Sequence, residues 1–121
     1  MRKLLMILVT GIIMLLIDLP YLMIIKDYFN KLIKDIQGTP IKLDLLASVL
    51  CYTLMSIGLW YFILRENREV IDAFILGIVI YGVYEATSKA LLKKWDWKTV
   101  LLDTLWGGVL FGLTTYIYKQ L

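Results

Sequence analysis

Four long apolar runs, separated by short clusters of charged residues, account for most of the 121-residue chain. A helix rises about 1.5 Å per residue, so each run has the roughly 20 residues needed to cross the hydrocarbon core of a bilayer. Hydrophobic residues make up 60% of the chain, and a soluble domain this short has no core large enough to bury them. The sequence predicts an all-α integral membrane protein, a four-helix transmembrane bundle in one domain, with spans at about 4–25, 43–64, 70–92 and 99–118.

The content of ligating and nucleophilic residues excludes several classes of site. Histidine is absent, and the single cysteine, Cys51, lies inside an apolar run. Ser-His-Asp, Cys-His and zinc hydrolase mechanisms are therefore excluded. The net charge of +3 is modest, and the lysines cluster between apolar runs, where membrane proteins keep them. We expect no catalytic residue set, no metal, no cofactor and no nucleic-acid partner.

The connection between the first two runs, 26–42, is the longest. Apolar residues recur in it at helical spacing, and charged residues occupy the other side. Two interpretations fit this pattern: an amphipathic helix at about 27–37 in the lipid headgroup region, or a solvated helical linker. Gly38 and Pro40 form a stop signal for either.

The short charged turns between the second, third and fourth runs predict antiparallel neighbours, with both chain termini on one side of the membrane. Five basic residues lie on the terminal side and seven on the other. The positive-inside rule therefore favours a cytoplasmic long loop. The residues counted are Arg2, Lys3, Arg65, Arg68 and Lys119 on one side, and Lys26, Lys31, Lys34, Lys42, Lys93, Lys94 and Lys98 on the other.

Three carboxylates interrupt runs that are otherwise lipid-compatible: Asp18, Glu85 and Asp103. A charge in hydrocarbon costs several kcal/mol unless it faces a partner or a water-filled cavity. Counted from the nearest lysine cluster, all three lie roughly 7–12 Å inside the same membrane face. We predict that they converge in the bundle interior, where mutual repulsion requires at least one to carry a proton. They are the candidate proton- or ion-binding residues.

Polar neighbours at three- and four-residue steps fit an inward stripe on each helix. Their hydroxyl and indole groups can donate hydrogen bonds to carboxylates. Lys89, four residues after Glu85, either pairs with it or extends to the interface. A functional polar cavity and a structural hydrogen-bond cluster both remain open as interpretations. The supporting residues are Tyr21, Tyr81, Tyr84, Ser88, Lys89 and Trp106.

Two further features concern helix shape. Pro20 removes an N–H and frees the Leu16 carbonyl, which either marks an ion site beside Asp18 or is a purely structural kink. Gly108 and Gly112 have the small-xxx-small spacing found at close helix contacts, which favours packing or dimerisation.

Four segments of the chain combine acidic, aromatic and small residues at fixed spacing: Asp18-x-x-Tyr-Leu22, Tyr81-Gly-x-Tyr-Glu-x-Thr-Ser88, Leu92-Lys-x-Trp95 and Asp103-x-x-Trp-Gly107. Together they resemble the family known as domain of unknown function 2177. The resemblance covers essentially the whole chain. It implies a small four-span membrane protein, from a family that is mostly bacterial with some viral members, and it implies no activity. This chain has Glu85, Ser88 and Tyr21 where the family has aspartate, asparagine and tryptophan.

Three functions are compatible with these features. The first is a proton- or cation-coupled transporter or channel-like protein that uses the acidic residues, and it is the one we favour. The second is a membrane-embedded enzyme acting on a lipid, against which stands the lack of an evident nucleophile with its base. The third is a structural or assembly protein. The expected partners are the lipid bilayer and further copies of the chain, with the small-molecule or ion ligand unidentified.

Overall fold

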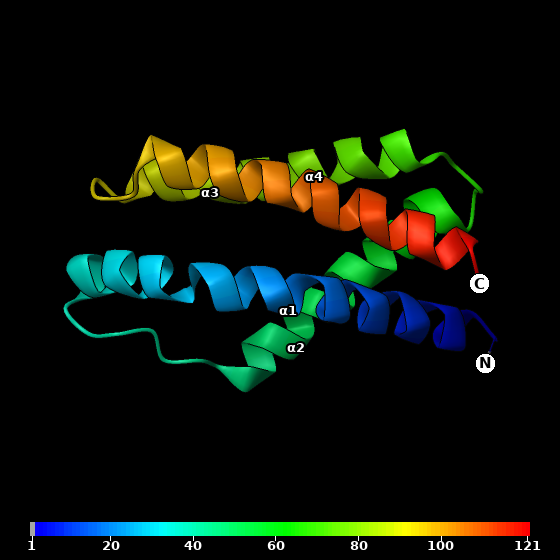
Figure 1. Ribbon diagram of the computed structural model, residues 1–121, viewed down its shortest axis with the longest axis horizontal. Coiled ribbons are helices and arrows are strands. Elements are labelled where there is room, and N and C mark those ends of the chain that lie inside the picture. Colours follow the sequence, from blue (N-terminus) through cyan, green and yellow to red (C-terminus); the bar gives the residue numbers. More distant parts are fainter. Residues whose placement is uncertain (1) are drawn as a thin grey trace.

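The computed structural model describes residues 2–121, and within them it contains four helices and no strand. These are α1 (Arg2–Gln37), α2 (Leu45–Leu59) with its π-helical continuation η1 (Trp60–Leu64), α3 (Val70–Leu91) and α4 (Trp97–Lys119). All four are long and apolar enough to cross a membrane. The prediction of an all-α transmembrane bundle is confirmed. Both ends of the chain lie at the same end of the bundle (Figure 1).

Helix α1 is the element whose extent differs most from the sequence expectation. It continues without a break past Pro20 and through the segment 27–37, so that segment is the last part of α1 and not a separate helix. No helix-breaking residue follows Pro20 until Gly38, whose positive φ of 81° ends the helix in the left-handed region. The amide of Gly38 accordingly donates to the Lys34 carbonyl at 2.8 Å.

The extension of α1 is held by a small apolar cluster. Leu32 packs with Trp95 and Val100, and Phe29 lies against them from the same side of α1. Trp95 is only 3% exposed. The turn between α3 and α4 is therefore folded back against the end of α1.

Helices α3 and α4 form a tight antiparallel hairpin, joined by the turn at the end of the bundle opposite the termini (Figure 1). Gly77 lies so close to Gly107 that a methyl group there would overlap the Gly107 carbonyl. A methyl group on Gly107 would in turn overlap the Tyr81 ring. Of the expected small-residue pair, Gly108 makes a close contact with Ile78 and Phe74, whereas Gly112 has ordinary contacts. Close backbone approach between small residues is a common way for transmembrane helices to associate.

The main apolar core joins all of the helices at the end of the bundle that carries the termini. Met14 of α1, Leu59 of α2, Ala73 of α3 and Phe111 of α4 are all fully buried in it. Helix α2 crosses α1 obliquely, and its main contacts are with α1 rather than with α3 (Figure 1).

Candidate functional site

The three carboxylates come from three different helices and are linked in one interior layer. Asp18 on α1 is 5% exposed and Glu85 on α3 is completely buried. Asp103 on α4 is half-buried. The aromatic side chains described next connect these groups, so their common depth in the sequence corresponds to real proximity in the fold.

Helices α1 and α4 are joined by a reciprocal pair of hydrogen bonds, which with the Tyr52 bond to Asp18 are called the brace below. The Trp106 indole N–H of α4 donates to Asp18 Oδ1 of α1 at 2.7 Å. The Tyr21 hydroxyl of α1 donates to Asp103 Oδ1 of α4 at 3.0 Å. The Tyr21 and Trp106 rings stack between the two bonds, with centroids 4.4 Å apart and planes 4° from parallel. Each helix thus supplies one carboxylate and one aromatic donor three residues apart, on one face.

Asp18 receives a second donor from α2. The Tyr52 hydroxyl donates to Asp18 Oδ2, so both oxygens of this buried carboxylate are occupied. Asp18 therefore ties together α1, α2 and α4. Gly11, two turns before Asp18, and Ser56, one turn after Tyr52, show the same close approach of α1 and α2, since a methyl group on Gly11 would lie 2.8 Å from Ser56 Oγ.

Glu85 is in a different situation. Its Oε1 accepts a hydrogen bond from the Trp95 indole N–H at 2.9 Å. Its Oε2 is buried and has no donor. The Asp103 carboxyl group is the acidic neighbour of Glu85 across the α3–α4 hairpin. Two carboxylates repel each other, and they can be joined by a hydrogen bond only when one of them carries a proton.

No lysine or arginine neutralises this pair. Within residues 2–121 the one ion pair joins Arg65 to Glu66, outside the site. Lys89, which the sequence places four residues after Glu85, has its Nζ 5.9 Å from the centre of the Trp97 ring. Of the two arrangements that the sequence allows, Lys89 therefore extends toward the interface and does not pair with Glu85. Within residues 2–121, no basic side chain therefore forms an ion pair with Glu85 or Asp103.

The remaining supporting residues lie beside the carboxyl layer. Tyr81 packs edge to face with Phe111 at a centroid distance of 6.4 Å, and so belongs to the α3–α4 contact. Tyr84 is 57% exposed, on the outer side of α3. Ser88 is half-buried, one turn beyond Glu85.

Two residues that contact the carboxylates were not expected from the sequence: Tyr52 and Trp95. Tyr52 lies ten residues after Lys42, at about the depth of Asp18, and this depth is the signal that identifies it. Trp95 belongs to the charged turn and is typical of an interfacial anchor. Only the folded turn, which returns its indole toward Glu85, reveals its contact.

The end of the site nearest the long loop is closed by a polar cluster at the membrane surface. Asp96 caps α4 by accepting the Thr99 amide at 2.8 Å, and the Tyr28 hydroxyl donates to Asp96 Oδ2 at 2.9 Å. Hydrogen bonding, first of all from the Thr99 hydroxyl, holds the pKa of Asp96 below its usual range. Asp96 is therefore an ionised group directly outside the buried pair.

The family model described as "Predicted membrane protein (DUF2177)" matches residues 3–118, so the chain belongs to that family. This confirms the resemblance drawn from the sequence. Searches of curated proteins and of solved structures give no match to the chain. The family description specifies a membrane protein and does not specify a reaction, a substrate or a partner.

Proposed function

We propose that this membrane protein binds a proton at the Glu85–Asp103 carboxyl pair and couples its uptake and release to the movement of a solute across the membrane. The observation that carries the proposal is Glu85 Oε2, which is buried without a donor next to a second carboxyl group. Buried ionisable groups of this kind mark proton relays and substrate pathways in membrane proteins.

The surroundings of the pair support a group that gains and loses a proton. Trp95 and Tyr21 each hold one oxygen in place, on Glu85 and Asp103 respectively. The other oxygens are free to share a proton, and no cationic side chain is bonded to them in the described chain. A carboxyl pair held in this way exchanges its proton without a rearrangement of the helices.

We include homo-oligomerisation in the proposal. Four helices of this length enclose little interior space, and Glu85 is completely buried between them. A second copy supplies the walls that a solute pathway needs. Cross-linking in native membranes, read as a band of twice the monomer mass, tests this part of the proposal on its own.

An assembly role is the second candidate, and Asp18 favours it. A carboxylate whose two oxygens bind donors from α2 and α4 resembles the interhelical hydrogen bonds that hold membrane bundles together. In that role the acids stabilise the fold and no proton moves.

The test uses purified protein in liposomes with a trapped pH-sensitive dye, and proton uptake driven by a potassium diffusion potential. We expect uptake by the wild type, and loss of it in Glu85→Gln and Asp103→Asn. Asp27→Asn is the matched control, because Asp27 is an exposed acid outside the site. Infrared spectroscopy gives a second readout: a protonated carboxyl band at neutral pH that both site variants remove. Uptake that is equal in all four proteins, with no such band, contradicts the proposal and leaves the assembly role.

A further inference from the structure

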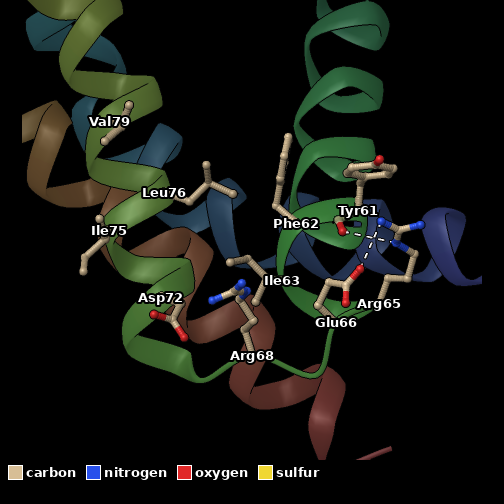
Figure 2. A pocket seen from close by; sticks show the side chains of 10 residues that line it. All are labelled: Tyr61, Phe62, Ile63, Arg65, Glu66, Arg68, Asp72, Ile75, Leu76 and Val79. Atoms are coloured by element: carbon tan, nitrogen blue, oxygen red, sulfur yellow. Dashed lines mark hydrogen bonds and ion pairs between the residues drawn. The ribbon is translucent and has the colours of Figure 1, made fainter.

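A groove separate from the carboxyl site opens between η1 and the first half of α3 (Figure 2). Its volume is about 520 Å³. One end is lined by charged side chains from the turn between the helices, and the rest is lined by apolar side chains. The apolar residues used below are Phe62, Ile75 and Val79, which are 57%, 53% and 54% exposed.

The groove exists because the chain leaves α2 through a π-helical turn. The Arg65 amide donates to the Trp60 carbonyl at 2.7 Å, five residues back, and the Arg68 amide donates to the Ile63 carbonyl at 2.9 Å. Asn67 then takes a positive φ of 51°, which turns the chain sharply into α3. Single π-helical turns are frequent at functional sites. Here the turn sets α2 apart from α3 and places two arginines at the mouth of the gap.

The charged side chains at the mouth of the groove contact one another and their own helices. Arg65 forms an ion pair with Glu66 at 3.1 Å and stacks over the Tyr61 ring at 4.0 Å. Asp72 accepts the Glu69 amide at 3.1 Å in a capping box at the start of α3. Arg68 has no ion-pair partner in the described part of the chain. The mouth therefore offers one unpaired guanidinium next to a carboxylate that has hydrogen-bonding capacity left.

Shape and charge together identify the occupant. The apolar wall from Asp72 to Val79 extends about 10 Å along α3, most of the roughly 15 Å that one leaflet adds to the hydrocarbon core. A groove with a charged mouth and an apolar shaft of this depth matches a phospholipid with its headgroup at the surface. The charged side chains at the mouth are two arginines and two acids. Their balance suits a headgroup that carries both charges.

We propose that this groove binds a zwitterionic aminophospholipid. Its phosphate contacts the Arg68 guanidinium, the geometry that arginine prefers for phosphate. Its ammonium faces Asp72. One acyl chain lies along Phe62, Ile75 and Val79. The site is independent of proton binding at Glu85 and stands if the proposed function fails.

The test is native mass spectrometry of the full-length protein, after exchange into detergent with added phosphatidylethanolamine or phosphatidylglycerol. We expect the wild type to retain one phosphatidylethanolamine, and Arg68→Gln to bind it about tenfold more weakly. Arg2→Gln is the matched control, since Arg2 is an exposed arginine predicted to lie at the same membrane face. A second variant, Val79→Trp, fills the apolar shaft, keeps every charge and should also release the lipid.

Three results overturn the proposal. One is equal retention of phosphatidylethanolamine by the wild type, Arg68→Gln and Val79→Trp. Another is retention of phosphatidylglycerol as tightly as phosphatidylethanolamine, which removes the role given to Asp72. The third is a lipid-free dimer that Val79→Trp disrupts, which shows that a second copy occupies the groove. Helical content measured by circular dichroism separates lipid loss from unfolding in both variants.

Discussion

Asp18 and Glu85 are two buried carboxylates in the same layer of one bundle, and their surroundings are opposite. Asp18 has a donor on each oxygen, from Tyr52 and Trp106. Glu85 has one donor, from Trp95, and an oxygen with none. Burial in an apolar span is equally costly for both charges. The number of donors, rather than depth, therefore separates Asp18, which joins helices, from Glu85, which we propose binds a proton.

The comparison also shows how each carboxylate is held. Asp18 is positioned by side chains from two other helices, so its environment exists only when the bundle is assembled. Glu85 is positioned within the α3–α4 hairpin, because Trp95 follows ten residues later in the turn and Asp103 lies on the partner helix. Both members of the proposed proton-binding pair thus lie in the hairpin, with Tyr21 of α1 as a further donor to Asp103, whereas the hydrogen bonds of Asp18 join three helices.

The largest effect is expected from Gly107→Leu, which separates the hairpin. A side chain there overlaps the Tyr81 ring, and overpacking of this kind costs about 3 kcal/mol. We expect that loss in the free energy of unfolding, measured by titration with a denaturing detergent in mixed micelles. Gly58→Leu is the control, since no atom lies within 4 Å of a methyl group at Gly58. Equal stability of the two variants contradicts the view that close α3–α4 packing holds Glu85 against Asp103.

The next effect is expected from Asp18→Leu. It removes two interhelical hydrogen bonds and leaves the Tyr52 and Trp106 donors without acceptors. Interhelical hydrogen bonds in membranes contribute about 0.6–1.7 kcal/mol each, so we expect a loss of about 1–3 kcal/mol in the same unfolding assay. Asp18→Asn keeps an acceptor for one donor and should recover part of the loss. If Asp18→Leu is as stable as the wild type, the brace does not stabilise the bundle.

A smaller effect of opposite sign is expected from Glu85→Gln. The amide oxygen still accepts from Trp95, and the amide nitrogen donates to Asp103 without any need for a shared proton. We expect the free energy of unfolding to stay the same or to rise by about 1 kcal/mol, while proton uptake is lost. A loss of stability as large as that of Asp18→Leu removes the distinction between the two carboxylates, and makes Glu85 a second structural anchor.

The bundle and its carboxyl layer are predictable from the sequence because they depend on quantities that run along one helix. Span length comes from apolar runs, and the depth of Asp18, Glu85 and Asp103 comes from their distance to flanking lysines. The three-residue steps from Asp18 to Tyr21 and from Asp103 to Trp106 place each pair on one face.

The partners of the carboxylates are less accessible to sequence reasoning, because they depend on how helices rotate and how a turn folds. Tyr52 contacts Asp18 only because α2 crosses α1 with that face inward. Trp95 contacts Glu85 only because the turn folds back beneath α1. The role of the three acids as proton or ion ligands is likewise a proposal that rests on chemistry and not on helical periodicity.

The smallest effect on stability is expected from Asp96, a third carboxylate, which lies at the membrane surface. Like Asp18 it accepts several donors, but it lies outside the spans. Hydrogen bonding, mainly from the Thr99 hydroxyl, lowers its pKa in the folded protein. A lowered pKa means that ionised Asp96 stabilises the fold above its unfolded pKa of about 3.9. This contribution disappears as the pH falls from about 4 through the lower folded pKa.

The measurement is the midpoint of thermal unfolding between neutral pH and about pH 3, for the wild type and Asp96→Asn. The other acids are present in both proteins, so the difference between the two curves reports the loss of the Asp96 charge. We expect the wild type to be more stable at neutral pH and the curves to converge in acid. Curves that stay parallel show that the cap at the start of α4 does not depend on the charge. The donors around a surface carboxylate then matter for geometry alone, unlike those around the buried Asp18.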